Sequence, residues 1–182
     1  MITYAKNIKK NIHIAFLDVT KAYDKAWLEA IMYVLHKEGV NDKHWNIAKK
    51  LNQNLTATIH TKYGLTRNIQ MNSIRQGGVL SVLEFGLLMD ETSKEITKKS
   101  LGITIEGMEK PIGSLLWVDD VILAEIESTN LQRMLDVADH TSNKYHTEYG
   151  ASKSNVMTIS YGNKQNIPTF NIQTRGHHPK GN

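Results

Sequence analysis

The chain has 182 residues, 40% of them hydrophobic, a size at which one compact domain can bury an adequate core. Its 22 Lys and Arg residues against 18 Asp and Glu residues give a net charge of +4, which permits a polyanionic partner without requiring one. The absence of cysteine excludes disulfides, thiolate metal sites and cysteine nucleophiles, and favours an intracellular location in the cytoplasm or nucleus. Signal-peptide and membrane-spanning stretches are also missing, so we expect no membrane partner.

The first half of the chain predicts a strand, two helices and a hairpin. Residues 12–19 are apolar and β-branched, as in a buried strand. Residues 21–39 carry apolar side chains at helical spacing and end in a glycine, which indicates one helix. Residues 42–50 predict a second, shorter helix. Residues 56–71 read as two strands with a turn at Tyr63 and Gly64.

The second half predicts a long helix, another hairpin, a helix and a last strand. Residues 79–99 follow two glycines and are apolar in their first half and charged in their second, as in a helix that leaves a core. Residues 113–126 are two apolar arms joined at an acidic pair, which indicates a tight hairpin. A helix over residues 128–145 and a strand over residues 156–161 complete the series.

This order of elements predicts an α+β fold, with an antiparallel sheet and helices packed on one face. We assign residues 1–165 to one domain. Residues 166–182 are polar and contain Gly and Pro, and we expect them to form a disordered tail.

Three carboxylates are the candidate site. Asp18 closes the first strand, and Asp119 and Asp120 form the tip of the hairpin at residues 113–126. If the two elements are neighbours in one sheet, these carboxylates converge and repel one another unless a cation binds. Mg²⁺ prefers such oxygen ligands and serves two-metal phosphoryl or nucleotidyl transfer. The alternative is an ordinary turn, although two charges beside deeply apolar arms are easier to explain at a functional site.

Several motifs resemble those of non-LTR retrotransposon (LINE-type) reverse transcriptases. FLDVTKAYDKAW at residues 16–27 resembles their first acidic motif, RQGGVLSVLEF at residues 75–85 resembles their PQGSVLSPLLF segment, and LLWVDD at residues 115–120 resembles their LxYADD motif. Residues 131–160 are similar to the helix, Lys-Ser pair and strand that follow in that family. The resemblance covers about residues 12–161. It implies the palm of a polymerase, which is a ferredoxin-like split βαβ fold.

The resemblance implies an RNA-directed DNA polymerase, as part of a retrotransposon polyprotein. Its partners would be an RNA template, a DNA primer and deoxynucleoside triphosphates, and its cofactors two Mg²⁺ ions, for which Mn²⁺ can substitute. Asp18, Asp119 and Asp120, with the backbone carbonyl of Val19, would hold the metal ions. We find no counterpart in this chain of the family's fingers or thumb, and without them the grip on nucleic acid should weaken.

Further roles follow from the resemblance. Tyr23 matches an aromatic residue that discriminates against the 2′-hydroxyl of an incoming nucleotide, with a core tyrosine as the alternative. Gln76 and Gly77 match a loop that contacts the nucleotide and template, with a plain loop as the alternative. Lys153 matches a lysine that protonates or neutralises the leaving pyrophosphate, with a surface lysine as the alternative.

The sequence also departs from the family pattern. Trp117 replaces Tyr or Phe, Gly78 replaces Ser, Val82 replaces Pro, and Glu84 places a charge on a normally apolar helix face. A buried, unpaired carboxylate there would be costly. Two further functions therefore stay open, namely a catalytically inactive remnant that binds nucleic acid or protein, and an unrelated two-metal nuclease that uses the same carboxylates.

Overall fold

The computed structural model describes residues 1–71, 73–150, 152–162 and 168–172. The chain divides into two compact units. We refer to Met1–Thr20 with Met89–Asn182 as the sheet unit, and to Lys21–Leu88 as the hairpin unit.

The described residues form six helices and eight strands, numbered separately in chain order. The helices are α1 (Ile2–Asn7), α2 (Ala22–Lys25), α3 (Leu28–Lys37), α4 (Asp42–Asn52), α5 (Ser81–Lys98) and α6 (Ser128–Lys144). The strands are β1 (Ile12–Asp18), β2 (Thr56–Ala57), β3 (His60–Thr61), β4 (Gly64–Leu65), β5 (Ile69–Gln70), β6 (Ser114–Trp117), β7 (Asp120–Glu125) and β8 (Asn155–Ile159).

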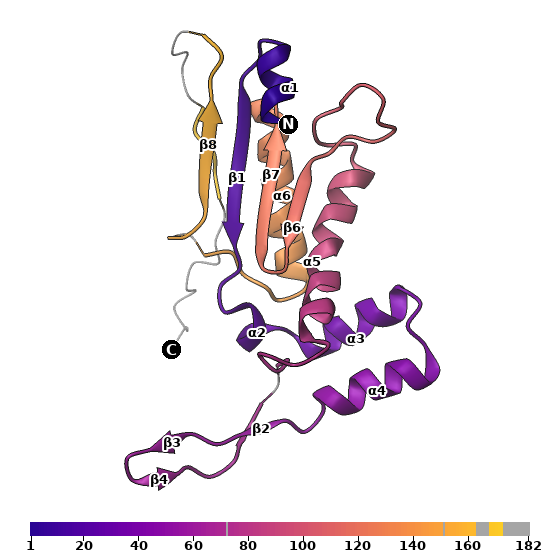
Figure 1. Cartoon of the computed structure of the whole chain (residues 1–182), viewed down its shortest axis with the longest axis vertical. Coiled ribbons are helices and arrows are strands. Elements are labelled where there is room, and N and C mark those ends of the chain that lie inside the picture. The colour runs from indigo at the N-terminus through magenta and orange to yellow at the C-terminus, as the bar shows by residue number, and fades with distance from the viewer. Residues whose placement is uncertain (72, 151, 163–167, 173–182) are drawn as a thin grey trace, which may run out of the picture. The chain divides into compact units, whose positions relative to one another are not determined.

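The sheet unit is built on a four-stranded sheet with the strand order β6-β7-β1-β8 (Figure 1). Every neighbouring pair in it is antiparallel. Helix α6 packs against β7 and β1. This arrangement confirms the predicted α+β fold with an antiparallel sheet.

Helix α6 covers one face of this sheet with a stripe of buried side chains. The stripe follows helical spacing, and its residues are Leu131, Met134, Leu135 and Ala138. On the strands, alternate residues point to the same face, and those that meet α6 are almost fully buried: Ala15, Leu17, Val121 and Leu123. Burying each large side chain contributes about 1.5–3 kcal/mol, so this layer is the main core of the unit.

Helix α1 packs on the other face of the sheet and was not predicted from the sequence. Its Ala5 forms a buried cluster with Ile12, Ile14 and Ala124, which alternate with the residues that face α6. The helix is one and a half turns long and has no capping hydrogen bond at its N-terminus, so it carries little signal of its own. Because it lies over the start of β1, it leaves the end of β1 at Asp18 open on that face.

In the hairpin unit the predicted helix over residues 21–39 is interrupted. Ala26 and Trp27 have extended backbone angles, which end α2 and place Trp27 at the N-cap of α3. Both residue types are compatible with a helix, so spacing alone does not reveal the break. At the break Ala26 is buried, with 1% of its surface exposed. The apolar spacing is correct for α3, which buries Ala30, Ile31, Met32, Val34 and Leu35.

The hairpin predicted at residues 56–71 is present in short pieces. Strand β2 pairs with β5, and β3 pairs with β4 around a turn at Lys62 and Tyr63. The predicted helices at residues 42–50 and 79–99 correspond to α4 and α5. In the part of the chain that the structure describes, no helix combines the length and apolar character needed to cross a membrane.

The predicted disordered tail falls largely outside the described residues, which exclude 166, 167 and 173–182. Within the described stretch 168–172, the Asn171 backbone N–H donates to Gln132 Oε1 at 2.9 Å, and Gln132 Nε2 donates to the Asn171 carbonyl at 3.1 Å. The boundary near residue 165 and the disorder beyond it stay predictions.

Glu84 is buried, as its position on α5 suggested, but one of its oxygens has a partner. The side chain is 2% exposed, and Asn52 Nδ2 donates to Glu84 Oε1 at 2.8 Å. The other oxygen, Oε2, is buried and has no hydrogen-bond partner among the described residues. Burial raises the pKa of Glu84, and the hydrogen bond from Asn52 offsets this only in part.

We predict that Glu84→Gln stabilises the chain at neutral pH. In the unfolded chain Glu84 ionises near its usual pKa of 4.5, whereas the folded chain favours the protonated form. The wild type therefore loses stability as the pH rises from about 4.5 through the raised pKa of the folded state. At pH 7 the free energy of unfolding of Glu84→Gln should exceed that of the wild type by about 1–3 kcal/mol.

Urea unfolding at pH 4 and pH 7 measures this difference. The advantage of Glu84→Gln should nearly vanish at the lower pH. The exposed Glu106 supplies the matched control, because Glu106→Gln should change stability little at either pH. An equal effect of Glu84→Gln at both pH values would contradict the prediction.

Candidate active site

The end of β1 and the β6–β7 hairpin meet at three aspartates. Strand β1 pairs with β7 so that Asp18 stands directly opposite Asp120, and directly opposite residues have their side chains on the same face. Asp119 is in the adjoining turn, where its carbonyl accepts a hydrogen bond from the Val19 N–H at 3.4 Å. The antiparallel register thus brings together residues about a hundred positions apart in the sequence.

The turn that carries Asp119 is strained. Trp117 pairs with Asp120, so Val118 and Asp119 form a two-residue loop. Val118 has a φ of 58°, which suits the first loop residue of a type II′ turn but is normally taken by glycine. A β-branched residue in this conformation costs roughly 1–3 kcal/mol. The acidic pair therefore stands on a turn whose shape the sheet imposes.

The segment before β8 closes around Asp18. The Gly150 N–H donates to the Asp18 carbonyl at 2.9 Å, and the Asp18 N–H donates to Ser154 Oγ at 3.3 Å. Lys153 Nζ lies 3.3 Å from Asp18 Oδ2. That contact is an ion pair without hydrogen-bond geometry, so the buried Oδ2 has no hydrogen-bond partner among the described residues. Lys153 is thus brought to the predicted site.

Gly150 and Ser154 are site residues to which the sequence assigned no role. A Cβ on Gly150 would lie 2.9 Å from Thr20 Oγ1, which is too close, and in ordinary contact with Asp18 Oδ2 at 3.7 Å. Ser154 is buried and belongs to the Lys-Ser pair that resembles the family motif. That pair is the one signal in the sequence that pointed to this segment.

The donor set fits a hard divalent cation, although the side chains do not surround one point. Carboxylate oxygens are the ligands that Mg²⁺ prefers, and Asp18 Oδ2 receives no hydrogen bond among the described residues, its charged neighbour being Lys153 Nζ at 3.3 Å. Within the described residues, however, no three His, Asp or Glu side chains are arranged to hold a single metal ion. Lys153 supplies the positive charge next to Asp18 instead.

The same face of the sheet presents exposed apolar side chains beside the carboxylates. Trp117 stands opposite Asp120, and Leu115, Ile122 and Phe16 form the next row across the strands. Trp117 is 79% exposed and Leu115 and Phe16 are 49% and 40% exposed. The indole that departs from the family pattern therefore projects from this face next to the acidic pair.

The other predicted site residues belong to the hairpin unit. Tyr23 is half-buried and packs against the fully buried Phe85, with ring centroids 5.6 Å apart. Gln76 is exposed. Gly77 has a φ of 78° in the turn before α5, and a Cβ there would meet nothing within 4 Å. Backbone conformation, rather than lack of room, is thus what requires glycine at position 77.

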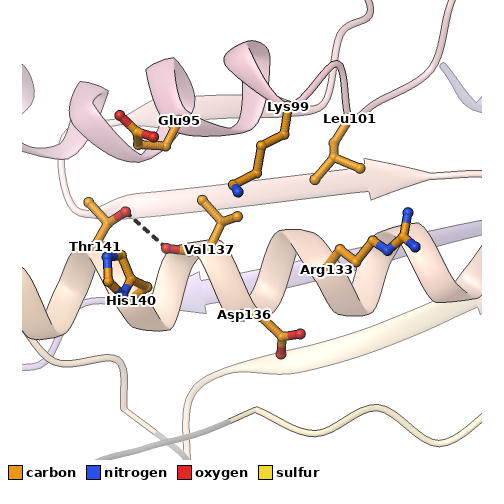
Figure 2. A pocket seen from close by; sticks show the side chains of 8 residues that line it. All are labelled: Glu95, Lys99, Leu101, Arg133, Asp136, Val137, His140 and Thr141. Atoms are coloured by element: carbon orange, nitrogen blue, oxygen red, sulfur yellow. Dashed lines mark hydrogen bonds between the residues drawn. The ribbon is translucent and has the colours of Figure 1, made fainter.

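A cavity lies between the end of α5 and α6 in the sheet unit, and its lining includes none of Asp18, Asp119 and Asp120 (Figure 2). It has a volume of about 650 Å³. Its charged side chains have both signs, and two of its carboxylates already have partners: Glu95 with Lys98 at 2.7 Å and Asp136 with Gln132 at 3.0 Å. Nothing in this lining resembles a reactive centre. Its residues are Glu95, Lys99, Leu101, Arg133, Asp136, Val137, His140 and Thr141.

Comparison with known proteins identifies the family. The family model described as "Reverse transcriptase (RNA-dependent DNA polymerase)" matches residues 2–177. No curated protein matches the chain.

Among solved structures, a telomerase from Candida tropicalis in complex with a fragment of telomeric RNA is similar over 95% of this chain and 31% of its own, with a TM-score of 0.65 and 14% identity. A Candida albicans telomerase, also bound to a fragment of telomeric RNA, matches over 92% of this chain and 30% of its own, with a TM-score of 0.62 and 11% identity. The chain thus spans about a third of these proteins. The likeness shows that its fold is that of the reverse transcriptase palm.

We predict that Val118→Gly raises the free energy of unfolding by about 1 kcal/mol. Glycine adopts the positive φ of the turn without strain, which outweighs its larger loss of entropy on folding. Thermal unfolding measures the change. Val156→Gly in β8, whose φ is not positive, is the matched control and should be destabilising. A Val118→Gly variant less stable than the wild type would show that the turn is not strained.

Proposed function

Since the chain belongs to the reverse transcriptase (RNA-dependent DNA polymerase) family, we propose that it is the palm of an RNA-directed DNA polymerase of the non-LTR retrotransposon type. The palm would lie within residues 1–165. The single observation that carries this function is the pairing of Asp18 with Asp120, beside Asp119, at one end of the two central strands. The motif set at residues 16–27, 75–85 and 115–120 supports the retrotransposon lineage.

The proposed reaction joins a primer 3′-oxygen to the α-phosphorus of a deoxynucleoside triphosphate and releases pyrophosphate. Asp18, Asp119, Asp120 and the Val19 carbonyl would hold two Mg²⁺ ions, or Mn²⁺ in their place. When bound, such ions lower the pKa of the attacking hydroxyl and stabilise charge on the leaving group. The hydrogen bonds at both backbone groups of Asp18 support this role, since they hold its carboxylate in place.

Lys153 has two proposed roles at different stages. Without metal it neutralises Asp18, from which its ammonium group is 3.3 Å away. During reaction the same ammonium would donate a proton to pyrophosphate as the bond from phosphorus to the leaving oxygen breaks. The Lys153 side chain is long and 70% exposed, so moving its ammonium group from Asp18 to the pyrophosphate would cost little free energy.

The hairpin unit would supply the substrate contacts. We propose that Tyr23, held by its packing against Phe85, excludes a ribose 2′-hydroxyl. Gln76 and Gly77 would contact the nucleotide and the RNA template from the turn before α5. Because the chain spans about a third of the similar telomerases, further segments would have to strengthen its hold on the template and the DNA primer.

A specific observation favours a second function, that of a catalytically inactive remnant. The ion pair between Lys153 and Asp18 satisfies the charge that a metal ion would otherwise neutralise. The described side chains also do not surround one metal position. Such a remnant would keep the fold and bind nucleic acid or protein without copying a template.

Primer extension on an RNA template tests the polymerase. We predict that Asp119→Ala lowers the rate by about a thousandfold or more, because several kcal/mol of stabilisation by the metal ions would be lost. Asp136→Ala on the exposed surface of α6 is the matched control and should extend the primer like the wild type. Equal extension by Asp119→Ala and the wild type would overturn the assignment of the aspartates. If the wild type itself fails to extend, the inactive remnant is favoured.

Metal binding separates the two functions without measuring activity. We predict that Mg²⁺ raises the melting temperature of the wild type and raises that of Lys153→Met further, because the competing cation at Asp18 is removed. A tenfold gain in affinity corresponds to about 1.4 kcal/mol of extra stability at saturating Mg²⁺. The exposed Lys110 provides the control variant Lys110→Met, which should behave like the wild type. No Mg²⁺-dependent shift in either the wild type or Lys153→Met would support the remnant.

A further inference from the structure

Positive charge is concentrated in one segment of the hairpin unit. Residues 43–83 contain no Asp or Glu. The whole chain has a net charge of +4 and this segment +6, so the remainder has −2. The cations are Lys43, Lys49, Lys50, Lys62, Arg67 and Arg75. A segment that carries several cations and no acid is typical of contact with a polyanion.

Lys62 and Arg67 are the cations of the β3–β4 hairpin, residues 59–67. Lys62 and Arg67 form no ion pair within the described part of the chain, and both are exposed. Lys62 Nζ lies over the ring of Tyr63, 4.8 Å from the ring centre. These charges are thus free to meet phosphate groups.

An exposed aromatic ring stands at the tip between these cations. Tyr63 is 88% exposed, and Leu65 and Ile59 on the same hairpin are 69% and 55% exposed. Local hydrogen bonds hold this tip in shape. Thr61 Oγ1 donates to the Gly64 carbonyl at 2.9 Å, and the Tyr63 N–H donates to Thr61 Oγ1 at 3.2 Å. The ring is therefore presented to solvent by an ordered turn.

We propose that the tip of this hairpin, residues 59–67, is a binding site for single-stranded nucleic acid. Tyr63 stacks on an unpaired base, while Lys62 and Arg67 contact the flanking phosphates. The inference rests on the proposed function only in taking nucleic acid as the partner of the chain. It requires neither the aspartates nor bound nucleotides.

The chemistry of the hairpin favours a single strand over a duplex or an acidic protein. Stacking on an aromatic side chain needs an unpaired base, and every base offers a face for it. A duplex would meet the cations but leave Tyr63 without a base. An acidic peptide would satisfy Lys62 and Arg67 but gain little from the ring.

Fluorescence anisotropy with the full chain tests the site, using a short labelled RNA of mixed sequence and a DNA of the same sequence. We predict that Tyr63→Ala weakens binding to either strand by about 5- to 150-fold, as expected for loss of one stacked base. Tyr63→Trp should keep the affinity, because indole also stacks. Tyr161→Ala is the matched control at an exposed tyrosine of the sheet unit.

Salt dependence tests the phosphate contacts separately. Arg67→Gln should lower the slope of log affinity against log salt by about 0.7, the value for one contact to a single strand. Arg133→Gln on α6 is the control and should leave the slope unchanged.

The inference is overturned if Tyr63→Ala and Arg67→Gln both bind like the wild type, or if Tyr63→Ala loses as much affinity for a duplex as for a single strand. Asp136→Ala on the exposed surface of α6 should bind both strands like the wild type. If the wild type binds through the hairpin but does not extend a primer, the binding site stands and the catalytically inactive remnant is favoured.

Discussion

The antiparallel pairing of β1 with β7 is the constraint on which the candidate site depends. Its register sets Asp18 opposite Asp120 and leaves Asp119 in the adjoining turn. A slip of one residue would turn Asp18 toward the face that α6 covers and bury an unpaired charge. The buried residues Ala15 and Leu17 prevent that slip, because they fill the α6 side. The apolar core therefore fixes the position of the charges.

The strain and the charge at this end of the sheet come from the pairing of β7 with its two neighbours, β6 and β1. Val118 adopts its positive φ because the β6–β7 arms close with only two loop residues between them. Asp18 is held at both backbone groups, and its carboxylate is balanced by Lys153 at 3.3 Å. Helix α1 covers the far end of the same face, through Ala5. Exposed side chains of that face, such as Trp117, therefore lie toward the carboxylate end of the sheet.

The two units differ in the charged residues that we propose for function. The sheet unit carries the aspartates, whereas residues 43–83 of the hairpin unit carry cations and no acid. Tyr63 and Glu84 of the hairpin unit each lie where their residue type is uncommon, one exposed and the other buried. The ring is exposed at the tip, and the carboxyl is buried against Asn52.

The sequence by itself determined the fold class and most element positions and pointed to the three aspartates as the candidate site, because strand alternation, helical spacing and ordered motifs are local properties. It did not reveal α1, the break at Ala26, or Asn52 as the partner of Glu84. Only the tertiary structure decided these, together with the ion pair between Lys153 and Asp18 and the closeness of Gly150 to Asp18. Each depends on which distant residues share a buried space, and no local pattern records that.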